Sequence, residues 1–222
     1  MSSEPSAVTS AQSSYWDGFY SAPHPDIAEP TTFAVHVEPQ LARGSFVFEL
    51  GCGNGRDAVY FARRGHRVAA CDLSHVAVDR LRQQIGTMQG LQSTPEIIVA
   101  DFAELGDQYA GQIDAIYARF TLHAIPVETE GLVLGWVSRN LRPGGRLHIE
   151  ARSVLGDLYG RGESAGEDAF IHDGHYRRFL RRDVLVHSVE RHGLVVDDVV
   201  EAAGLAVYLD DDPVVIRLVA RR

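Results

Sequence analysis

The sequence has few cysteines, fewer basic than acidic residues and no long apolar run. Its 222 residues include only Cys52 and Cys71, which form neither a CxxC motif nor a Cys/His pattern of the kind that binds zinc. His172 and His175 are neighbours at positions i and i+3, but no obvious third ligand accompanies them. We therefore expect neither a disulfide framework nor a metal site.

Charge and hydropathy exclude further classes of function. The 30 acidic and 21 basic residues give a formal net charge of −9, which disfavours binding along a nucleic-acid backbone. No apolar run approaches the roughly 20 residues that span a bilayer, and the first residues lack the basic and apolar segments of a signal peptide. We expect a cytoplasmic protein, monomeric or homodimeric, that binds neither nucleic acid nor membranes.

The first 44 residues differ in composition from the rest of the chain. Residues 1–14 are rich in Ser, Ala and Thr with few large apolar side chains, so we expect them to be disordered. The aromatic cluster YWDGFY (15–20) follows, then a proline-containing stretch and a possible helix at 31–41. We expect residues 15–44 to form an N-terminal lid whose rings close over a cationic ligand. An amphipathic packing element is the alternative.

From residue 45 onwards, apolar strands alternate with helices. Strands are predicted near 45–50, 66–72, 96–100, 113–118, 146–151, 195–200 and 214–219, and helices near 57–65, 75–85, 102–105, 127–141 and 182–192. This alternation predicts one α/β domain over 45–222 with a buried parallel sheet. Residues 153–181 form an insertion, glycine-rich in its first part, that we expect to be a mobile substrate loop. A surface loop without function is the alternative.

A glycine turn follows the first predicted strand. The sequence GCGNG (51–55) between a strand and a helix lets the backbone approach a nucleotide-like ligand closely. Asp72 ends the second strand, where a carboxylate can accept hydrogen bonds from both ribose hydroxyls, and Asp101 ends the third. An NAD-binding turn is disfavoured, because its fingerprint G-x-G-x-x-G requires glycine at the position of Arg56. For Asp101, capping of a short helix is the alternative role.

With these motifs the sequence resembles the class I S-adenosylmethionine-dependent methyltransferases, whose first motif, E/D-x-G-x-G-x-G, is matched by ELGCGNG from Glu49 to Gly55. The resemblance covers about residues 45–151, including LRPGGRLHIEA (141–151). It implies an enzyme with a Rossmann-like, doubly wound, mostly parallel seven-stranded sheet whose last strand is antiparallel. It also implies S-adenosyl-L-methionine as the cofactor and S-adenosyl-L-homocysteine as its product.

The resemblance also implies roles for individual residues. The glycines of the first motif would lie under the methionine moiety, Asp72 would bind the ribose, and Asp101 with Phe102 would contact the adenine. The complete predicted cofactor site is Tyr15, Trp16, Tyr20, Glu49, Gly51, Cys52, Gly53, Gly55, Arg56, Asp57, Asp72, Leu73, Ser74, Asp101, Phe102, Ala118 and Arg119.

Three segments resemble a narrower group within this family. GCGNGRD (51–57), HYRRF (175–179) and the C-terminal GLAVYLDDDPVVIRLVARR (204–222) are similar to a subgroup of carbohydrate- and natural-product-modifying methyltransferases. The likeness to thiopurine- and tellurite-detoxifying enzymes is more distant. This resemblance implies a small-molecule acceptor.

Ligands of open α/β sheets bind beyond the carboxyl ends of the strands, so the residues there are candidates for the acceptor site. His123 follows the fourth predicted strand, and a neutral imidazole can act as general base. Arg152 ends the fifth and can bind an anionic oxygen group bidentately. The predicted catalytic residues are His123, Arg152, His175 and Tyr176, and the predicted substrate site is Tyr20, Arg119, His123, Arg152, His175, Tyr176 and Arg178.

These assignments have structural alternatives. His123 is equally consistent with packing at a helix start, and Arg177 and Arg178 with a solvated basic face beside a core Phe179. The favoured function is O- or N-methylation of a small polar or anionic metabolite, sugar or natural-product intermediate. A non-catalytic S-adenosylmethionine-binding partner subunit is one alternative. A protein or nucleic-acid methyltransferase is another, although RFTLHAIP (119–126) replaces the NPPY-type segment typical of nucleic-acid amino-methylating enzymes.

Overall fold

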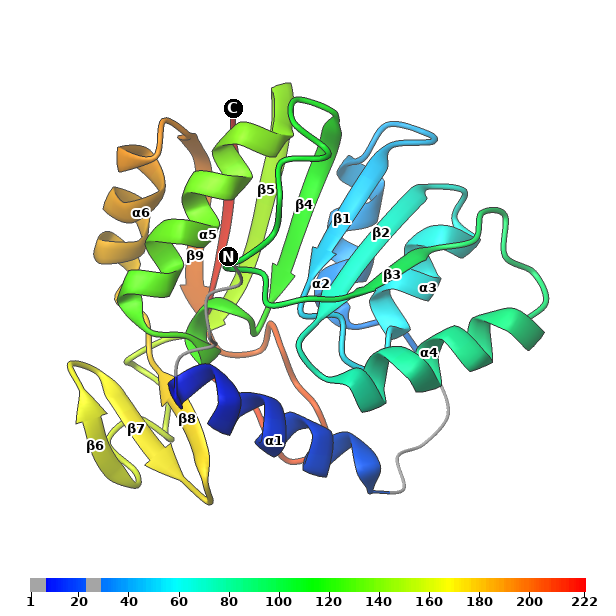
Figure 1. Cartoon of the computed structure of the whole chain (residues 1–222). Coiled ribbons are helices and arrows are strands. Elements are labelled where there is room, and N and C mark those ends of the chain that lie inside the picture. Colours follow the sequence, from blue (N-terminus) through cyan, green and yellow to red (C-terminus); the bar gives the residue numbers. More distant parts are fainter. Residues whose placement is uncertain (1–6, 23–28) are drawn as a thin grey trace.

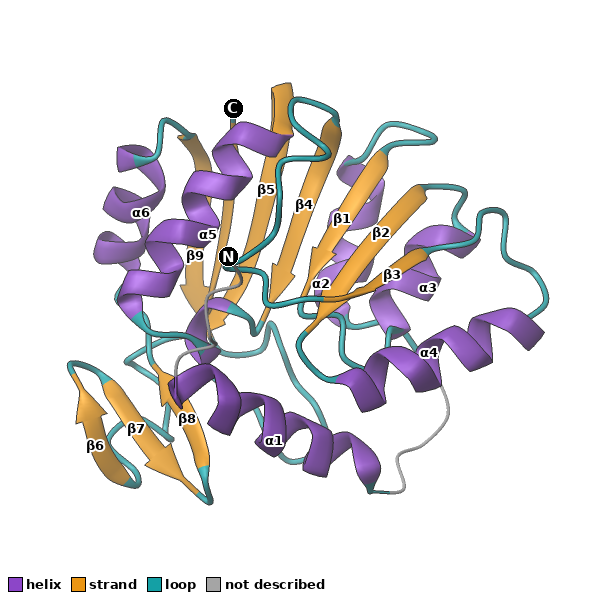
Figure 2. Cartoon of the chain, viewed as in Figure 1, coloured by secondary structure: helices purple, strands orange, loops and turns teal. Residues whose placement is uncertain are grey.

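A computed structural model describes residues 7–22 and 29–222, and a seven-stranded sheet lies at its centre (Figures 1 and 2). The strand order is β3-β2-β1-β4-β5-β10-β9. Strand β10 is antiparallel to its neighbours β5 and β9, and the other neighbours pair in parallel. The strands are β1 (Phe46–Leu50), β2 (Arg67–Asp72), β3 (Glu96–Val99), β4 (Ile113–Arg119), β5 (Leu141–Arg152), β9 (Val195–Ala202) and β10 (Val215–Arg221). This topology confirms the predicted Rossmann-like fold with an antiparallel last strand.

The sheet separates two hydrophobic cores. Phe46, Phe48 and Leu50 of β1 face one core, and Val47 between them faces the other, because successive strand residues point to opposite faces. Helices α5 and α6 cover the first core, and α2, α3 and α4 cover the second. Their bounds are α2 (Thr32–Val37), α3 (Arg56–Arg63), α4 (His75–Thr87), α5 (Val127–Asn140) and α6 (Arg182–Arg191), with short 3₁₀ turns η1 (Glu38–Gln40) and η2 (Leu122–Ala124). Burial on both faces explains the nearly continuous apolar strands.

Helix α1 (Ala7–Ser21) lies across the carboxyl ends of the strands (Figure 1). Asp17 Oδ1 accepts hydrogen bonds from Ser74 Oγ at 2.6 Å and from the backbone N–H of Val76 at 3.3 Å, at the N-terminus of α4. Arg80 of α4 donates in return to the carbonyls at the end of α1. These contacts suit the partial charges of the two helix ends.

Three local expectations need correction. Residues from Ala7 are helical where we expected disorder over 1–14; residues 1–6 lie outside the described part. Residues 102–105 form a turn instead of a short helix, because Asp101 Oδ1 accepts from the N–H of Ala103 and a Gly follows at 106. The insertion 153–181 is not a plain loop, since it contains the antiparallel strands β6 (Glu163–Gly166), β7 (Ala169–His172) and β8 (His175–Arg178).

The hairpin β7–β8 depends on its turn. Asp173 and Gly174 both have positive φ, at 52° and 72°, between the paired residues His172 and His175. Two central residues of this kind form the turn that best matches the twist of a hairpin. The dipeptide Asp-Gly was therefore a usable signal for a hairpin within the segment expected to be a loop.

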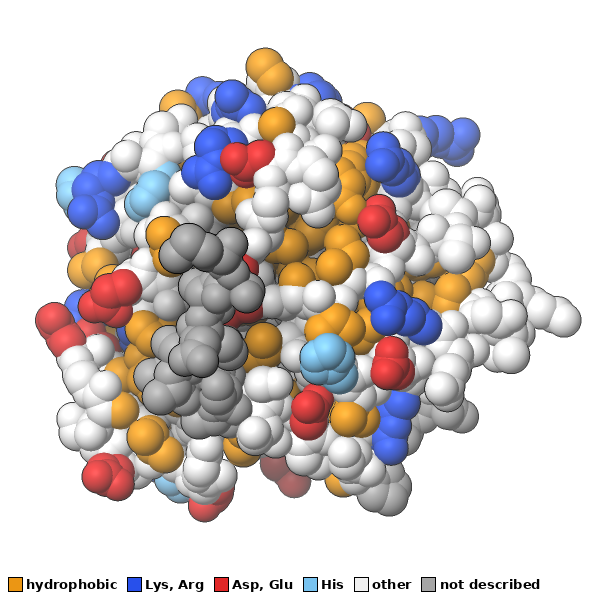
Figure 3. Space-filling model, in the orientation of Figure 1, with side chains coloured by type: hydrophobic (Ala, Val, Ile, Leu, Met, Phe, Trp, Pro, Cys, Tyr) orange, Lys and Arg blue, Asp and Glu red, His pale blue; other side chains and the backbone are white. Residues whose placement is uncertain are grey.

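The surface carries mixed charge on the face drawn in Figure 3. Away from the grey atoms, basic and acidic side chains are interspersed there (Figure 3). Within residues 7–22 and 29–222, no helix has the length and hydrophobicity needed to cross a membrane.

Stability should depend on pH through His148. This histidine of β5 is fully buried, and neither ring nitrogen has a hydrogen-bond partner among the described residues. Burial, followed by the charges of Arg146 and His36, lowers its pKa to about 3. Between pH ~6.5 and ~3 the unfolded chain therefore binds a proton at this residue that the folded chain does not, so acidification lowers the free energy of unfolding by up to about 1.4 kcal/mol per pH unit.

Urea denaturation at several pH values would measure this effect. A His148→Gln variant should lose that part of the pH dependence, and the same change at the exposed His187 should leave it in place. Equal slopes in the wild type and in His148→Gln would contradict the assignment.

Candidate functional site

A turn of glycines joins β1 to α3 at the carboxyl edge of the sheet. Gly51, Gly53 and Gly55 have φ of 69°, 53° and 76°, values that favour glycine. A Cβ on Gly55 would lie 2.3 Å from a methyl carbon of Leu81, and one on Gly53 would lie 2.2 Å from the hydroxyl of Tyr20. The turn is therefore closely packed on one side by α4 and on the other by α1.

Two buried carboxyl groups flank the turn. Asp72 ends β2 and accepts hydrogen bonds from the backbone N–H groups of Gly53 at 2.7 Å and Ser74 at 2.9 Å. Burial raises its pKa, and the backbone donors partly oppose this shift. Glu49 Oε2 has no hydrogen-bond partner among the described residues, and burial, then Asp57 and Asp72, raise the pKa of Glu49 well above its usual value. Glu49 thus offers an unsatisfied acceptor beside the turn.

A cavity of about 400 Å³ lies between the turn, the strand ends and α1. Most of the predicted cofactor residues line it: Trp16, Tyr20, Glu49, Gly51, Cys52, Gly53, Arg56, Asp57, Asp72, Leu73, Phe102 and Arg119. Phe19 and Asn54, which belong to the YWDGFY and GCGNG segments singled out above, also line it. Sequence reasoning missed the remaining lining residues, which are Gln12, Phe120, Thr121, Ala124, Ile125 and Tyr208. These lie on α1, after β4 and in the loop before β10, and apart from their place beside the strand ends no motif identifies them.

The other predicted cofactor residues, although close by, lie outside the cavity lining. Gly55 packs on Leu81, and Ser74 caps α4 by accepting from the N–H of Ala77. The residues outside the lining are Tyr15, Gly55, Ser74, Asp101 and Ala118. Their cofactor roles stay predictions.

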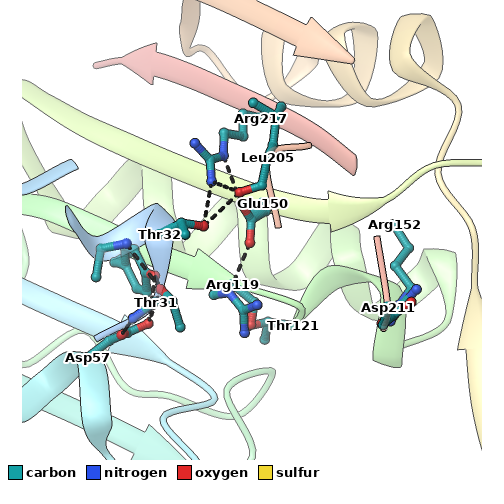
Figure 4. A network of polar contacts seen from close by, with 12 residues as sticks. Thr31, Thr32, Asp57, Arg119, Thr121, Glu150, Arg152, Leu205, Asp211 and Arg217 are labelled. Atoms are coloured by element: carbon teal, nitrogen blue, oxygen red, sulfur yellow. Dashed lines mark hydrogen bonds and ion pairs between the residues drawn. The ribbon is translucent and has the colours of Figure 1, made fainter. Parts of the chain in front are cut away.

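Asp57 lines the cavity but is already engaged in a buried network. Its carboxylate accepts from the N–H and hydroxyl of Thr31, both at 2.8 Å, and from the Tyr117 hydroxyl at 2.7 Å (Figure 4). It thereby fastens the N-terminus of α2 to α3 and β4. This contact set is that of a structural residue.

A second cavity, of about 960 Å³, lies beside the first between α1, the β6–β8 sheet and the starts of α5 and α6. Gln12 and Trp16 line both cavities, so the two meet at α1. Of the predicted acceptor residues, His175, Tyr176 and Arg178 line the second cavity, whereas Tyr20 and Arg119 line the first. His123 and Arg152 line neither.

His123 and His175 lie close together near the junction of the cavities. His123 is 5% exposed, and burial, followed by Arg152, His175, Arg177 and Arg119, lowers its pKa well below the usual value. The ring of His175 stacks on Tyr15 at 4.7 Å, and burial lowers its pKa to about 4. Both imidazoles are neutral at pH 7.

Glu150 holds two of the arginines at the strand ends. It is fully buried on β5 and accepts from Arg119 Nε at 2.9 Å and Arg217 Nε at 2.8 Å (Figure 4). Arg217 also donates to the hydroxyl of Thr32 and the carbonyl of Leu205. Glu150 therefore joins β4, β5 and β10 at this edge of the sheet. Through Arg217 it also links these strands to Thr32 and Leu205.

Phe120 follows β4 with a φ of 55°, which is uncommon for a bulky residue. Its ring lies under the guanidinium groups of Arg119, at 4.1 Å, and Arg152, at 5.4 Å. The backbone here departs from the strand, which turns the aromatic ring towards the first cavity. Sequence reasoning gave no signal for this residue.

The environment of Arg178 is neither that of a solvated basic residue nor that of an arginine with free donors for a substrate, the two roles considered for it. Only 8% exposed, it donates to the carbonyls of Ile125 at 3.1 Å and Leu122 at 3.2 Å, and it forms an ion pair with Glu130. It is thus not part of a solvated face, and these donors are engaged within the protein. Phe179 is buried in the core, as the structural alternative expected.

Several known proteins are similar in sequence to parts of this chain. Residues 47–145 match the family model described as "Methyltransferase domain". Thiopurine S-methyltransferase of Xanthobacter autotrophicus is 35% identical over 106 residues, 42% of this chain and 50% of that protein. The tRNA 5-carboxymethoxyuridine methyltransferase of Escherichia coli is 30% identical over 111 residues, 50% of this chain and 40% of that protein. The chain thus matches half or less of the length of these curated relatives.

A solved structure covers more of the chain. The 1,6-didemethyltoxoflavin-N1-methyltransferase of Burkholderia thailandensis, with bound 1,6-didemethyltoxoflavin and S-adenosylhomocysteine, superimposes with a TM-score of 0.68. The sequence identity is 16%, and the match covers 100% of this chain and 93% of that one. At this identity the likeness concerns the fold.

Replacing Glu150 by glutamine should destabilise the protein. The change removes the buried carboxylate and leaves Arg119 and Arg217 without their ionic partner, which costs about 3–5 kcal/mol. Thermal and urea denaturation would measure the loss. A Glu163→Gln change on the exposed strand β6 is the matched control and should stay within about 0.5 kcal/mol. Equal stabilities of the two variants would disprove the role of Glu150.

Proposed function

We propose that the chain is a class I S-adenosylmethionine-dependent methyltransferase that transfers a methyl group from S-adenosylmethionine to a small-molecule acceptor; the match of residues 47–145 to a methyltransferase domain family supports this. The observation that carries the proposal is the pair of adjoining cavities that share Gln12 and Trp16. One has the size and polar groups for the cofactor, and the other has room for an acceptor beside it.

The residues of the first cavity fit the cofactor. Asp72 would accept hydrogen bonds from the ribose, and the unsatisfied Glu49 oxygen would accept one from the ammonium group of the methionine moiety. The glycine turn leaves the backbone open to close approach, and Phe102 supplies an apolar surface for the adenine. The cofactor itself supplies the electrophilic methyl group, while the protein positions the reactants and excludes water.

The second cavity would bind the acceptor. Its volume of about 960 Å³ is in the range of drug-sized ligand sites. Aromatic side chains of Tyr15, Trp16 and Tyr176 contribute to its wall, and it meets the first cavity at Gln12 and Trp16 of α1. An acceptor bound here would present an oxygen or nitrogen atom past Gln12 and Trp16.

His123 is the proposed general base for such an acceptor. It lies in the η2 turn that follows β4, and its neutral imidazole can accept a proton as the methyl group is transferred. His175 lies close to it and is the second candidate.

Two other functions remain as alternatives with distinct tests. A non-catalytic partner subunit would bind S-adenosylmethionine without turnover on any acceptor. A macromolecular methyltransferase, favoured by the tRNA-modifying relative, would methylate RNA or protein instead of metabolites. Turnover measured against hydroxylated, carboxylated and phosphorylated metabolites, with tRNA and protein extracts in parallel, separates the three.

Asp72 should contribute strongly to cofactor binding. An Asp72→Ala change removes a charged acceptor and should weaken S-adenosylhomocysteine binding by about 1.5–3 kcal/mol. Titration calorimetry would measure it, with Asp79→Ala on the exposed side of α4 as the matched control. An unchanged dissociation constant in folded Asp72→Ala would remove this residue from the ribose site.

His123 should affect the chemical step and leave cofactor binding nearly unchanged. A His123→Ala change should lower kcat by about 10²–10⁴-fold, the usual contribution of a positioned base. Because the pKa of His123 is held low, kcat/KM of the wild type should not fall as the pH passes about 6.5, the value of free imidazole. A folded His123→Ala enzyme with the parental kcat on a hydroxyl acceptor would exclude His123 and favour His175 or Tyr176.

A further inference from the structure

Positive charge gathers at one place in this acidic chain. Arg152 ends β5 and Arg177 lies on β8, and both are near enough to His123 and His175 to lower the pKa of each imidazole. The chain as a whole has a net charge of −9. Like charges brought together in a partly buried site repel unless an anion lies between them.

Arg177 has no ionic partner in the described part of the chain. Its side chain is half-buried and makes no hydrogen bond or ion pair there. Burial, followed by Arg152, lowers the pKa of Arg177, and Tyr15, Asp211 and Asp173 oppose this shift only in part. A guanidinium group has five donors, and those of Arg177 make no bond within the described part of the chain. These donors are available to a ligand.

The two histidines add unsatisfied atoms at the same place. His123 and His175 are 5% and 7% exposed. The Nδ1 atom of His123 and both ring nitrogens of His175 have no partner among the residues that the structure describes. Buried polar atoms are nearly always hydrogen-bonded, so these nitrogen atoms are available to a polar ligand.

Arg152 does have a partner, which comes from a surface loop. Its Nη2 lies 2.6 Å from Asp211 Oδ2 in the loop between β9 and β10 (Figure 4). The Arg152 side chain is 12% exposed, whereas that of Asp211 is 45% exposed. A pair with a solvent-exposed carboxylate contributes little stability, so another anion can replace Asp211.

We propose that Arg152 and Arg177, which lie beside the second cavity and not in its lining, bind a carboxylate or phosphoryl group of the methyl acceptor, and that Asp211 occupies this anion site when no acceptor is bound. The proposal rests on the proposed methyltransferase function and narrows the acceptor to anionic molecules. Arg177 takes the place expected for Arg178, whose bonds to Glu130 and two carbonyls give it a structural role.

Anion binding would also raise the pKa of the two histidines. An anion between the two guanidinium groups weakens the positive potential at His123 and His175 and makes both imidazoles more basic. The acceptor would thus improve the base that acts on it. The other groups facing His175 are the rings of Tyr15 and Trp16 of α1.

The test uses the full chain with bound S-adenosylhomocysteine and needs no knowledge of the acceptor. The pKa of His175 is followed by NMR in the presence of sulfate, which stands for a phosphoryl group, or trifluoroacetate, which stands for a carboxylate. Both keep their charge over the titrated range. Potassium chloride of equal ionic strength is the control, because chloride cannot accept a bidentate pair of hydrogen bonds.

Three variants are expected to change the affinity for the probes in different directions, and a fourth is the control. One or both probes should raise the pKa of His175 in the wild type and bind about tenfold or more weakly in Arg152→Gln and Arg177→Gln. They should bind about two- to fivefold more tightly in Asp211→Asn, which removes the internal competitor. Arg146→Gln, at an exposed arginine in the middle of β5, should behave as wild type. If only sulfate raises the pKa of His175, the site binds a phosphoryl group; if only trifluoroacetate does so, it binds a carboxylate.

Two results would overturn the proposal. One is a pKa of His175 that responds to neither probe in both the wild type and Asp211→Asn. The other is a response that persists unchanged in Arg152→Gln and Arg177→Gln, which would locate the anion elsewhere. Calorimetry with S-adenosylhomocysteine is run on the same samples, so failure to bind the cofactor refutes the proposed function separately from the anion site.

Discussion

A single buried carboxylate, that of Glu150, sets the arrangement of the strand ends. A fully buried charge is tolerated only when it is paired, and Glu150 satisfies this requirement with Arg119 of β4 and Arg217 of β10. Because Arg217 also bonds to Thr32 and Leu205, the same pairing holds α2 and the loop before β10 against the sheet. The guanidinium of Arg119 is thereby fixed over Phe120, at the wall of the cofactor cavity.

Helix α1 is held by contacts at its C-terminal end and in its middle. Asp17 and Arg80 join α1 to α4, and the ring of Tyr15 stacks on His175 of β8. One helix thus contacts both α4, which packs against the glycine turn, and the β6–β8 sheet, which borders the second cavity. Since Gln12 and Trp16 line both cavities, movement of α1 would change both sites together.

The central sheet and the cofactor turn could be predicted from sequence because both depend on local patterns. Apolar strands, the GCGNG turn and Asp72 at a strand end follow one another in the chain. The pairing of Arg178 with Glu130 could not be predicted, because the two residues lie 48 positions apart and nothing local distinguishes Arg178 from Arg177. The β7–β8 hairpin was predictable in part, because the sequence contains its Asp-Gly turn.

The contrast between Arg177 and Arg178 follows from strand geometry. Neighbouring residues of β8 point to opposite faces, so one guanidinium is directed to Glu130 and the carbonyls of the η2 region, and the other to the side of Arg152. A sequence motif with two adjacent arginines therefore contains one structural residue and one available for binding. Register, which is set by the turn at Asp173 and Gly174, decides which arginine has which role, and a shift by one residue would exchange them.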